Sequence, residues 1–213
     1  MRRELHVRFC EGGGVKLPSA TRLLACFQFK EDAERFLREL KERLGKFHLE
    51  VEPTKTKLLA FGRFARRDAQ SRGKKPEEFD FLGLTHSCGL TRKGQFKVIR
   101  RTSDKKFRAK LKGAKAWLKR VRTEMKAGAV LKRAKAGLVG HLNYYAITDN
   151  ARRCDSFRRQ VMLLMFKWLN RRSQRRSYTW AQFYSALAWV EWPSVRIVHK
   201  LDPYQRIVDL NAC

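Results

Sequence analysis

The stretch QFKVIRRTSDKKFRAKLKGAKAWLKRVR, residues 95–122, contains the change of pattern that decides the fold. Its first part, 95–102, has the length and the β-branched and aromatic content of a strand. From Asp104 onward the apolar residues instead recur every three or four positions, as on one face of a helix. They are Phe107, Leu111, Ala114, Leu118 and Val121. We therefore expect the chain to divide near residue 103.

Upstream of this point the pattern alternates between strands and a single helix. Ala33, Phe36, Leu37, Leu40 and Leu44 have helical spacing and are followed by Gly45, which offers a stop. The expected strands are short apolar or alternating runs. They cover 22–29, 47–52, 57–62 and 79–87, with 66–78 as a polar loop and 88–94 as the turn of a β-hairpin to 95–102.

Downstream the helical period continues to the end of the patterned sequence. Two further apolar stripes follow the first: Leu131, Ala134, Leu138, Leu142 and Tyr145, and then Phe157, Val161, Leu164, Met165 and Trp168. The segment 179–190 predicts a shorter fourth helix. The predicted fold class is α+β: a small sheet with one helix and a β-hairpin, followed by a basic all-α bundle.

The charge is strongly positive and unevenly distributed. The 213 residues include 49 Lys and Arg against 20 Asp and Glu, a formal net charge of +29. Residues 91–213 hold 30 of those basic residues and only 7 of the acidic ones. Such a balance requires a polyanionic partner, while 43% hydrophobic content is too high for a disordered basic tail. Nucleic acid is the expected partner of the second half.

Cysteines and hydropathy exclude several other classes. The five cysteines are scattered and never form Cys-x-x-Cys, and the nearby His86 and Cys88 lack a second pair of ligands for zinc. We expect no metal or other cofactor. No run reaches the ~20 apolar residues of a membrane span, and no signal peptide is recognisable. We therefore expect a cytoplasmic protein with reduced thiols and no membrane partner.

Three segments in this order resemble a group II intron-encoded reverse transcriptase/maturase. FQFKEDAERFLRELKERLGKFHLEVEPTKTKLLAFGRFA (27–65) is similar to the palm segment after the catalytic hairpin. FDFLGLTHSCGLTRKGQFKV (79–98) is similar to the end of the palm, with Leu84 at a position where Phe is usual. GHLNYYAITDN (140–150) matches the Gly-x-x-Asn-Tyr-Tyr element of the maturase-specific domain. The resemblance covers roughly residues 23–203.

The resemblance implies a domain division. Residues 23–103 correspond to a partial reverse-transcriptase palm, 104–125 to a thumb-like basic helix and 126–203 to the maturase-specific domain. Residues 1–22 stay unassigned and 204–213 form a tail. Three positions match palm residues near the nucleotide and the primer end: Lys55, Phe81 and Gly83. Each also has a purely structural interpretation, as a loop lysine, a strand-core aromatic and a glycine that allows close backbone approach.

The same alignment shows that the family's catalytic carboxylates are missing. The family has Tyr-Ala-Asp-Asp before the strand that aligns with 23–29, and this chain has Ser19, Ala20, Thr21 and Arg22 there. Two-metal phosphoryl transfer needs carboxylates to hold its ions. We therefore expect no catalytic residue, no Mg²⁺ site and no polymerase activity in this chain. The segment that would carry the remaining catalytic Asp has no counterpart in it.

The expected RNA contacts lie mostly on the helix that starts at Asp104. Its cations have only Asp104 to oppose them up to residue 122, and the resemblance places the thumb here, so phosphate contact is favoured over a merely solvated face. The predicted contacts are Lys105, Lys106, Arg108, Lys112, Lys115, Lys119, Arg120 and Arg122, with Lys110 on the same helix. Further along we expect Arg158, Arg159, Arg171, Arg172, Arg175 and Arg176 to contact the RNA backbone.

The stretch 140–150 has no Lys or Arg, although basic segments flank it. On a helical wheel Tyr145 falls within the buried stripe, His141 and Tyr144 lie on its shoulder, and Asn143 faces the other way. His141, Asn143 and Tyr144 are therefore candidates for shape-selective RNA contact, with helix packing as the open alternative. Trp180, Trp189 and Trp192 have two interpretations, bundle core or stacking on bases, of which core is favoured.

The resulting hypothesis is an RNA-binding fragment of a group II intron maturase that assists intron folding and splicing, while the intron RNA performs the chemistry. Two alternatives stay open. A functionless relic of a decayed mobile element would be flanked by a degenerate intron, or by none. A basic DNA-binding protein would have equal affinity for intron RNA and random duplex DNA. The sequence gives no indication of the oligomeric state.

Overall fold

The computed structural model describes residues 5–10, 22–53, 56–172 and 177–201. Among the predicted positions, Ser19, Ala20, Thr21, Lys55, Arg175 and Arg176 lie outside this part, as does the side chain of Arg22. The chain is α+β, as predicted, and separates into two compact units, residues 1–99 and 100–213. No helix in the described ranges is long and apolar enough to cross a membrane.

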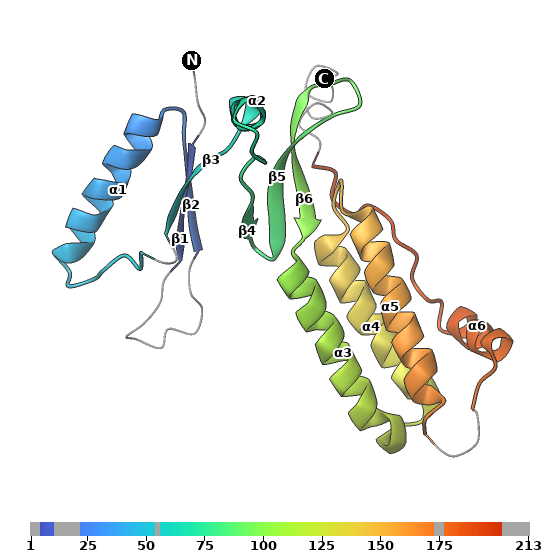
Figure 1. Cartoon of the computed structure of the whole chain (residues 1–213). Coiled ribbons are helices and arrows are strands. Elements are labelled where there is room, and N and C mark those ends of the chain that lie inside the picture. The colour runs from blue at the N-terminus through green and yellow to red at the C-terminus, as the bar shows by residue number, and fades with distance from the viewer. Residues whose placement is uncertain (1–4, 11–21, 54–55, 173–176, 202–213) are drawn as a thin grey trace, which may run out of the picture. The chain divides into compact units, whose positions relative to one another are not determined.

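The first sheet of unit 1 has the order β2-β1-β3 (Figure 1). Its strands are β1 (Leu5–Cys10), β2 (Arg22–Phe27) and β3 (Lys57–Ala60). β1 is antiparallel to both neighbours, with Val7 opposite Ala25 on one side and Leu58 on the other. Part of the segment left unassigned in the sequence thus supplies the central strand, which pairs both β2 and β3.

Helix α1 (Lys30–Gly45) follows β2 as predicted, and its apolar stripe is half-buried except at Ala33. Ala33 is fully buried, and Phe27, Phe36 and Leu58 are among the residues packed around it. The rings of Phe27 and Phe36 lie 5.1 Å apart. A small residue at position 33 lets the helix backbone approach these larger side chains closely.

Two predictions for the neighbouring segments were wrong. Residues 47–52, expected as a strand, form turns and irregular backbone, with His48 in the left-handed region at φ 56°. Their alternating pattern finds no strand partner, and Phe47 and Leu49 are exposed. The segment 66–78, expected as a polar loop, begins inside a helix, α2 (Arg63–Ser71). Its first residues are good helix formers, and the breakers that suggested a loop come later, at Gly73 and Pro76.

The second sheet has the order β4-β5-β6, with β4 (Phe79–Phe81), β5 (Leu84–Leu90) and β6 (Phe96–Thr102). The run 79–87, predicted as one strand, turns back on itself at Leu82 and Gly83, with φ values of 49° and 78°. Two positive φ angles are typical of the tight hairpin turn that suits the twist of its strands. Gly83 therefore allows this turn, and the close backbone approach expected there stays a prediction. Phe81 packs against the cluster of Leu59, Phe61 and Phe79.

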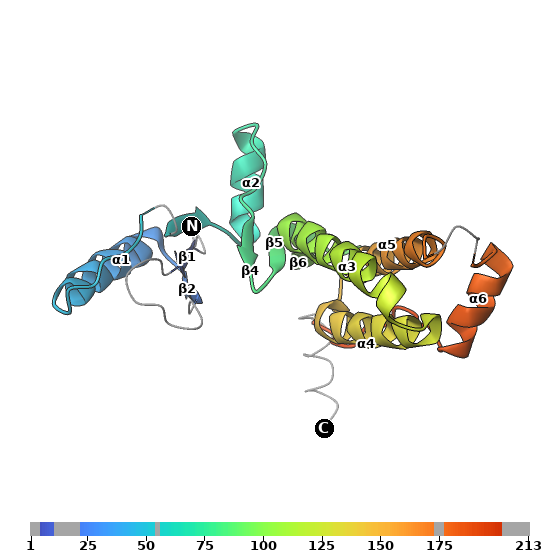
Figure 2. The same cartoon turned by 90° about the horizontal axis from the view of Figure 1, so that it is seen from below.

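Unit 2 is a helical bundle in which α3, α4 and α5 lie side by side (Figures 1 and 2). The helices are α3 (Asp104–Glu124), α4 (Ala127–Tyr145), α5 (Ala151–Leu169) and the shorter α6 (Trp180–Trp189). Ser103 caps α3, because its hydroxyl accepts a hydrogen bond from the backbone N–H of Lys106. The three predicted stripes face the core; within them Leu111, Ala114 and Leu164 are only half-buried.

Candidate nucleic-acid interface

Helix α3 presents the predicted row of cations to solvent. Seven are exposed and Arg122 is half-buried. The exposed ones are Lys105, Lys106, Arg108, Lys112, Lys115, Lys119 and Arg120. The helix has one carboxylate at each end, Asp104 and Glu124, and Asp104 pairs with Arg153 of α5. The middle of α3 thus keeps an unneutralised positive face.

Three cations, two from α3 and one that follows α5, gather around the buried ring of Trp168 at the far end of α3. The Lys119 ammonium lies 5.2 Å from the ring centroid, and the guanidinium carbons of Arg122 and Arg171 lie 5.1 and 5.6 Å from it. Arg122 also donates a hydrogen bond of 2.9 Å to the carbonyl of Arg171. We call Lys119, Arg122 and Arg171 the Trp168 cluster. It joins α3 to the residues that follow α5.

The Trp168 ring and the C-terminal end of α5 offset the repulsion between these three cations. Each cation gains a cation–π contact, and the carbonyl ends of α5 carry partial negative charge. Among the ion pairs of the described residues, none involves these three side chains. Arg172, beside the cluster, donates a hydrogen bond of 2.8 Å to the carbonyl of Met125. The arrangement is suited to an anion such as a phosphate, which would relieve the repulsion.

The other predicted cations on α5 are partly neutralised. Arg158 and Arg159 both pair with Asp155, each at 3.1 Å, on the same helix. Such surface pairs contribute little to stability and are screened by salt. Arg158 and Arg159 therefore remain within reach of solvent, but the Asp155 carboxylate weakens the local positive potential compared with α3.

The stretch 140–150, which has no Lys or Arg, divides as follows. Tyr145 is buried, at 4% exposure, whereas Tyr144 is 50% exposed and Asn143 is exposed, as predicted. His141 was predicted at the boundary, and this is wrong: it is only 5% exposed. Its ring stacks between Tyr145 at 4.7 Å and Phe157 of α5 at 3.9 Å. The wheel of α4 alone did not show that α5 covers this shoulder.

Asn150 stabilises the turn between α4 and α5. The sequence analysis did not identify this role. It is fully buried. Its Oδ1 accepts a hydrogen bond from the backbone N–H of Thr102 (2.8 Å), and its Nδ2 donates to the Thr102 hydroxyl (2.8 Å) and to the carbonyl of Tyr145 (2.7 Å). One amide thus ties the end of β6 to the end of α4. The only available signal was a polar Thr-Asp-Asn triplet between two helical stripes.

The residues before the C-terminal tail cover another part of the stretch. Ile147 and His199 form an isolated β-bridge, and the N–H of Val198 donates to the carbonyl of Ala146 at 2.7 Å. His199 Nε2 lies 3.0 Å from the carbonyl of Asn143. Much of 140–150 therefore lacks basic residues because it is packed against other parts of the bundle. Tyr144 and the side chain of Asn143 remain at the surface.

The tryptophans of the last helix are more exposed than predicted. Trp180 is 39% exposed and Trp189 is 61% exposed, so their assignment to the core was wrong, while Trp192 is half-buried. Trp180 stacks on Phe166 of α5 at 3.7 Å, and Lys132 of α4 lies 4.9 Å from the Trp189 ring centroid. An exposed indole ring beside a cation, as at Trp189, is typical of surfaces on which bases stack.

His141 gives unit 2 a predictable pH dependence. Burial, and to a smaller extent the nearby charge of Lys110, lower its pKa from 6.5 to about 4. Because the unfolded chain takes up this proton at a higher pH than the folded one, stability should fall as pH decreases from about 6.5 to about 4. Urea unfolding at several pH values measures this. The His141→Phe variant should show a smaller loss over that window, and an equal loss would contradict the assignment.

Comparison with family models, with curated proteins and with solved structures found no match to this chain. The similarity to maturases therefore rests on the three quoted segments and their order.

Proposed function

We propose that this chain binds structured RNA, with a group II intron as its partner, and helps that RNA to fold for splicing. The observation that carries RNA binding is the positive face of α3 together with the Trp168 cluster. Phosphate contacts supply most of the affinity of nucleic-acid-binding proteins. The three maturase-like segments support the choice of intron RNA within that class.

The surface also has features that favour RNA over duplex DNA. Unpaired bases in RNA loops and bulges stack on aromatic side chains, which paired DNA does not allow. Tyr144, Trp180 and Trp189 are exposed aromatics on a basic bundle. A protein that used phosphate contacts alone would need none of them at its surface. We propose further that the chain acts in the cytoplasm. We also propose that it performs no phosphoryl transfer, since the family's paired aspartates are missing from its sequence.

Neutralising the Trp168 cluster should lower both the affinity for RNA and its salt dependence. Each lost phosphate contact lowers the slope of log affinity against log salt by about 0.9 on duplex and about 0.7 on single strands. The Lys119→Gln, Arg122→Gln, Arg171→Gln triple variant should thus lose roughly 2–3 units of slope. Fluorescence anisotropy with a structured RNA at 50–300 mM salt provides the measurement.

The matched control removes three exposed cations from α1 in unit 1, with Arg38→Gln, Lys41→Gln and Arg43→Gln. It lowers the net charge equally and should leave the slope close to that of the unaltered chain. Equal slopes for the two triple variants would mean that total charge, rather than the Trp168 cluster, determines binding.

A further inference from the structure

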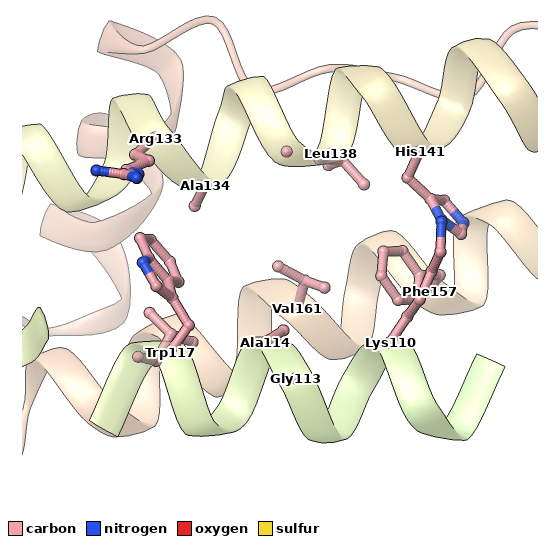
Figure 3. Close-up of a pocket in the computed structure, with 12 residues that line it drawn as sticks. Lys110, Gly113, Ala114, Trp117, Arg133, Ala134, Leu138, His141, Phe157 and Val161 are labelled. Carbon is pink, nitrogen blue, oxygen red and sulfur yellow. The ribbon is translucent and has the colours of Figure 1, made fainter. Parts of the chain in front are cut away.

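A pocket of about 400 Å³ opens between α3 and α4 (Figure 3). Trp117 of α3 extends toward Arg133 of α4 at one end, and Lys110 of α3 meets His141 of α4 at the other. Val161 and Phe157 of α5 lie behind the gap. We call this the α3–α4 pocket. Its volume falls within the ~300–1,000 Å³ that is usual for small-ligand sites.

The walls of the pocket are apolar, and four of the residues that form them have a small side chain or none. Each helix contributes one glycine and one alanine to the lining: Gly113 and Ala114 from α3, and Ala134 and Gly137 from α4. A Cβ atom added at Gly113 or Gly137 would have no other atom within 4 Å. The glycines therefore do not serve close packing between the helices. They leave open a space that larger side chains would fill.

The two ends of the pocket are cationic, and none of the described residues that line it is acidic. Lys110 Nζ lies 3.3 Å from His141 Nδ1. Burial lowers the pKa of Lys110, and the charge of Lys106 lowers it in the same direction, so this cation lacks part of its hydration. Arg133 is exposed at the opposite end. An anion at each mouth would be favourable.

His141, which lines the pocket, also has one buried hydrogen-bonding atom without a partner among the described residues. A charged Lys110 can only donate to Nδ1, which places the ring proton of the neutral imidazole on Nε2. That Nε2 is buried without a hydrogen-bond partner in the described structure. Buried polar atoms normally have a partner, and leaving one unpaired costs free energy. This Nε2 is closed to solvent, so recognition of a ligand by the pocket rests on its apolar walls and its two cationic ends.

We propose that the α3–α4 pocket receives one unpaired nucleobase of the bound RNA, with the adjoining phosphates against Lys110 and Arg133. A nucleotide within an RNA strand has the required form: a base with planar apolar faces and an anionic phosphate on each side. Trp117 supplies an aromatic surface for stacking, worth roughly tenfold in affinity for a single base. This inference rests on the proposed RNA-binding function and names the structural feature of RNA that the protein selects.

The experiment compares two RNA hairpins of equal length, one fully paired and one with a single extrahelical adenine replaced by 2-aminopurine. The unaltered chain should bind the bulged hairpin about tenfold more tightly and quench its fluorescence. Gly137→Phe fills the pocket and should abolish both effects, while its affinity for the paired hairpin stays unchanged. Gly140→Phe is the matched control, because Gly140 also has open space around it but does not line the pocket. This variant should behave like the unaltered chain.

Arg133→Gln provides a second test that leaves the apolar walls intact, and we expect it to reduce the preference for the bulge about threefold. Equal binding of both hairpins by the unaltered chain, or a preference that survives Gly137→Phe, would overturn the pocket assignment but not RNA binding. Binding of neither hairpin would overturn the proposed function as well. Displacement of the bulged hairpin by free AMP at a similar concentration would also overturn the inference, because the pocket would then be a mononucleotide site.

Discussion

Replacing Tyr145 with alanine is expected to lower the free energy of unfolding of unit 2 by about 3–5 kcal/mol, as for other core aromatics. Its ring is 4% exposed, stacks on His141 at 4.7 Å and lies under the ammonium of Lys110 at 4.5 Å. Removing the ring leaves a cavity that the three surrounding helices cannot readily close. Urea unfolding followed by circular dichroism gives the value.

Tyr144 is the matched control, one residue away on the same helix and 50% exposed. Tyr144→Ala should change the free energy of unfolding by less than about 1 kcal/mol, since surface substitutions usually have small effects. If Tyr144 stacks on a base, the same variant should weaken RNA binding by ~1–3 kcal/mol. Similar destabilisation by both substitutions would contradict the placement of Tyr145 in the core and Tyr144 at the surface.

Asn150→Ala should destabilise unit 2 by about 3 kcal/mol or more, although the side chain it removes is small. The variant leaves the N–H of Thr102 and the carbonyl of Tyr145 without their partner, and each buried unsatisfied group costs about 1–3 kcal/mol. Asn150 is fully buried, so water does not replace the lost bonds. Asn143→Ala, at an exposed position of the same stretch, should be nearly neutral. Equal effects of the two substitutions would contradict the role given to Asn150.

The helices of unit 2 were predictable because their apolar positions have one period over many turns. Phe107, Leu118 and Val121 on α3 repeat at the spacing that a helix requires, and all three are buried. The shorter elements of unit 1 were less predictable. Residues 47–52 have the alternation of a strand, but pairing depends on a neighbour that local sequence does not specify. The left-handed conformation of Leu82 could not be predicted either, because leucine seldom adopts a φ of 49°.

The exposed cations of the candidate site could be predicted for the same reason as the helices, namely the regular period of the apolar positions. Exposure on α3 follows from its own stripe, so the outward position of Lys112 and Lys115 could be derived from the helix alone. Contacts between helices could not. The approach of Arg171 to the Trp168 ring, and the burial of His141 beneath Phe157, depend on how α3, α4 and α5 pack. The hydrogen bonds between Asn150 and Thr102 likewise join residues 48 positions apart in the sequence.

The proposed selection of structured RNA is tested most directly by competition at fixed salt. A labelled group II intron RNA bound to the unaltered chain is challenged with unlabelled intron RNA, and separately with random duplex DNA of equal length and phosphate content. We expect the RNA to compete at least tenfold more effectively, because stacking and shape add to the phosphate contacts that both share. Equal competition by the duplex DNA would contradict the account and indicate a basic protein that binds nucleic acid through phosphates alone.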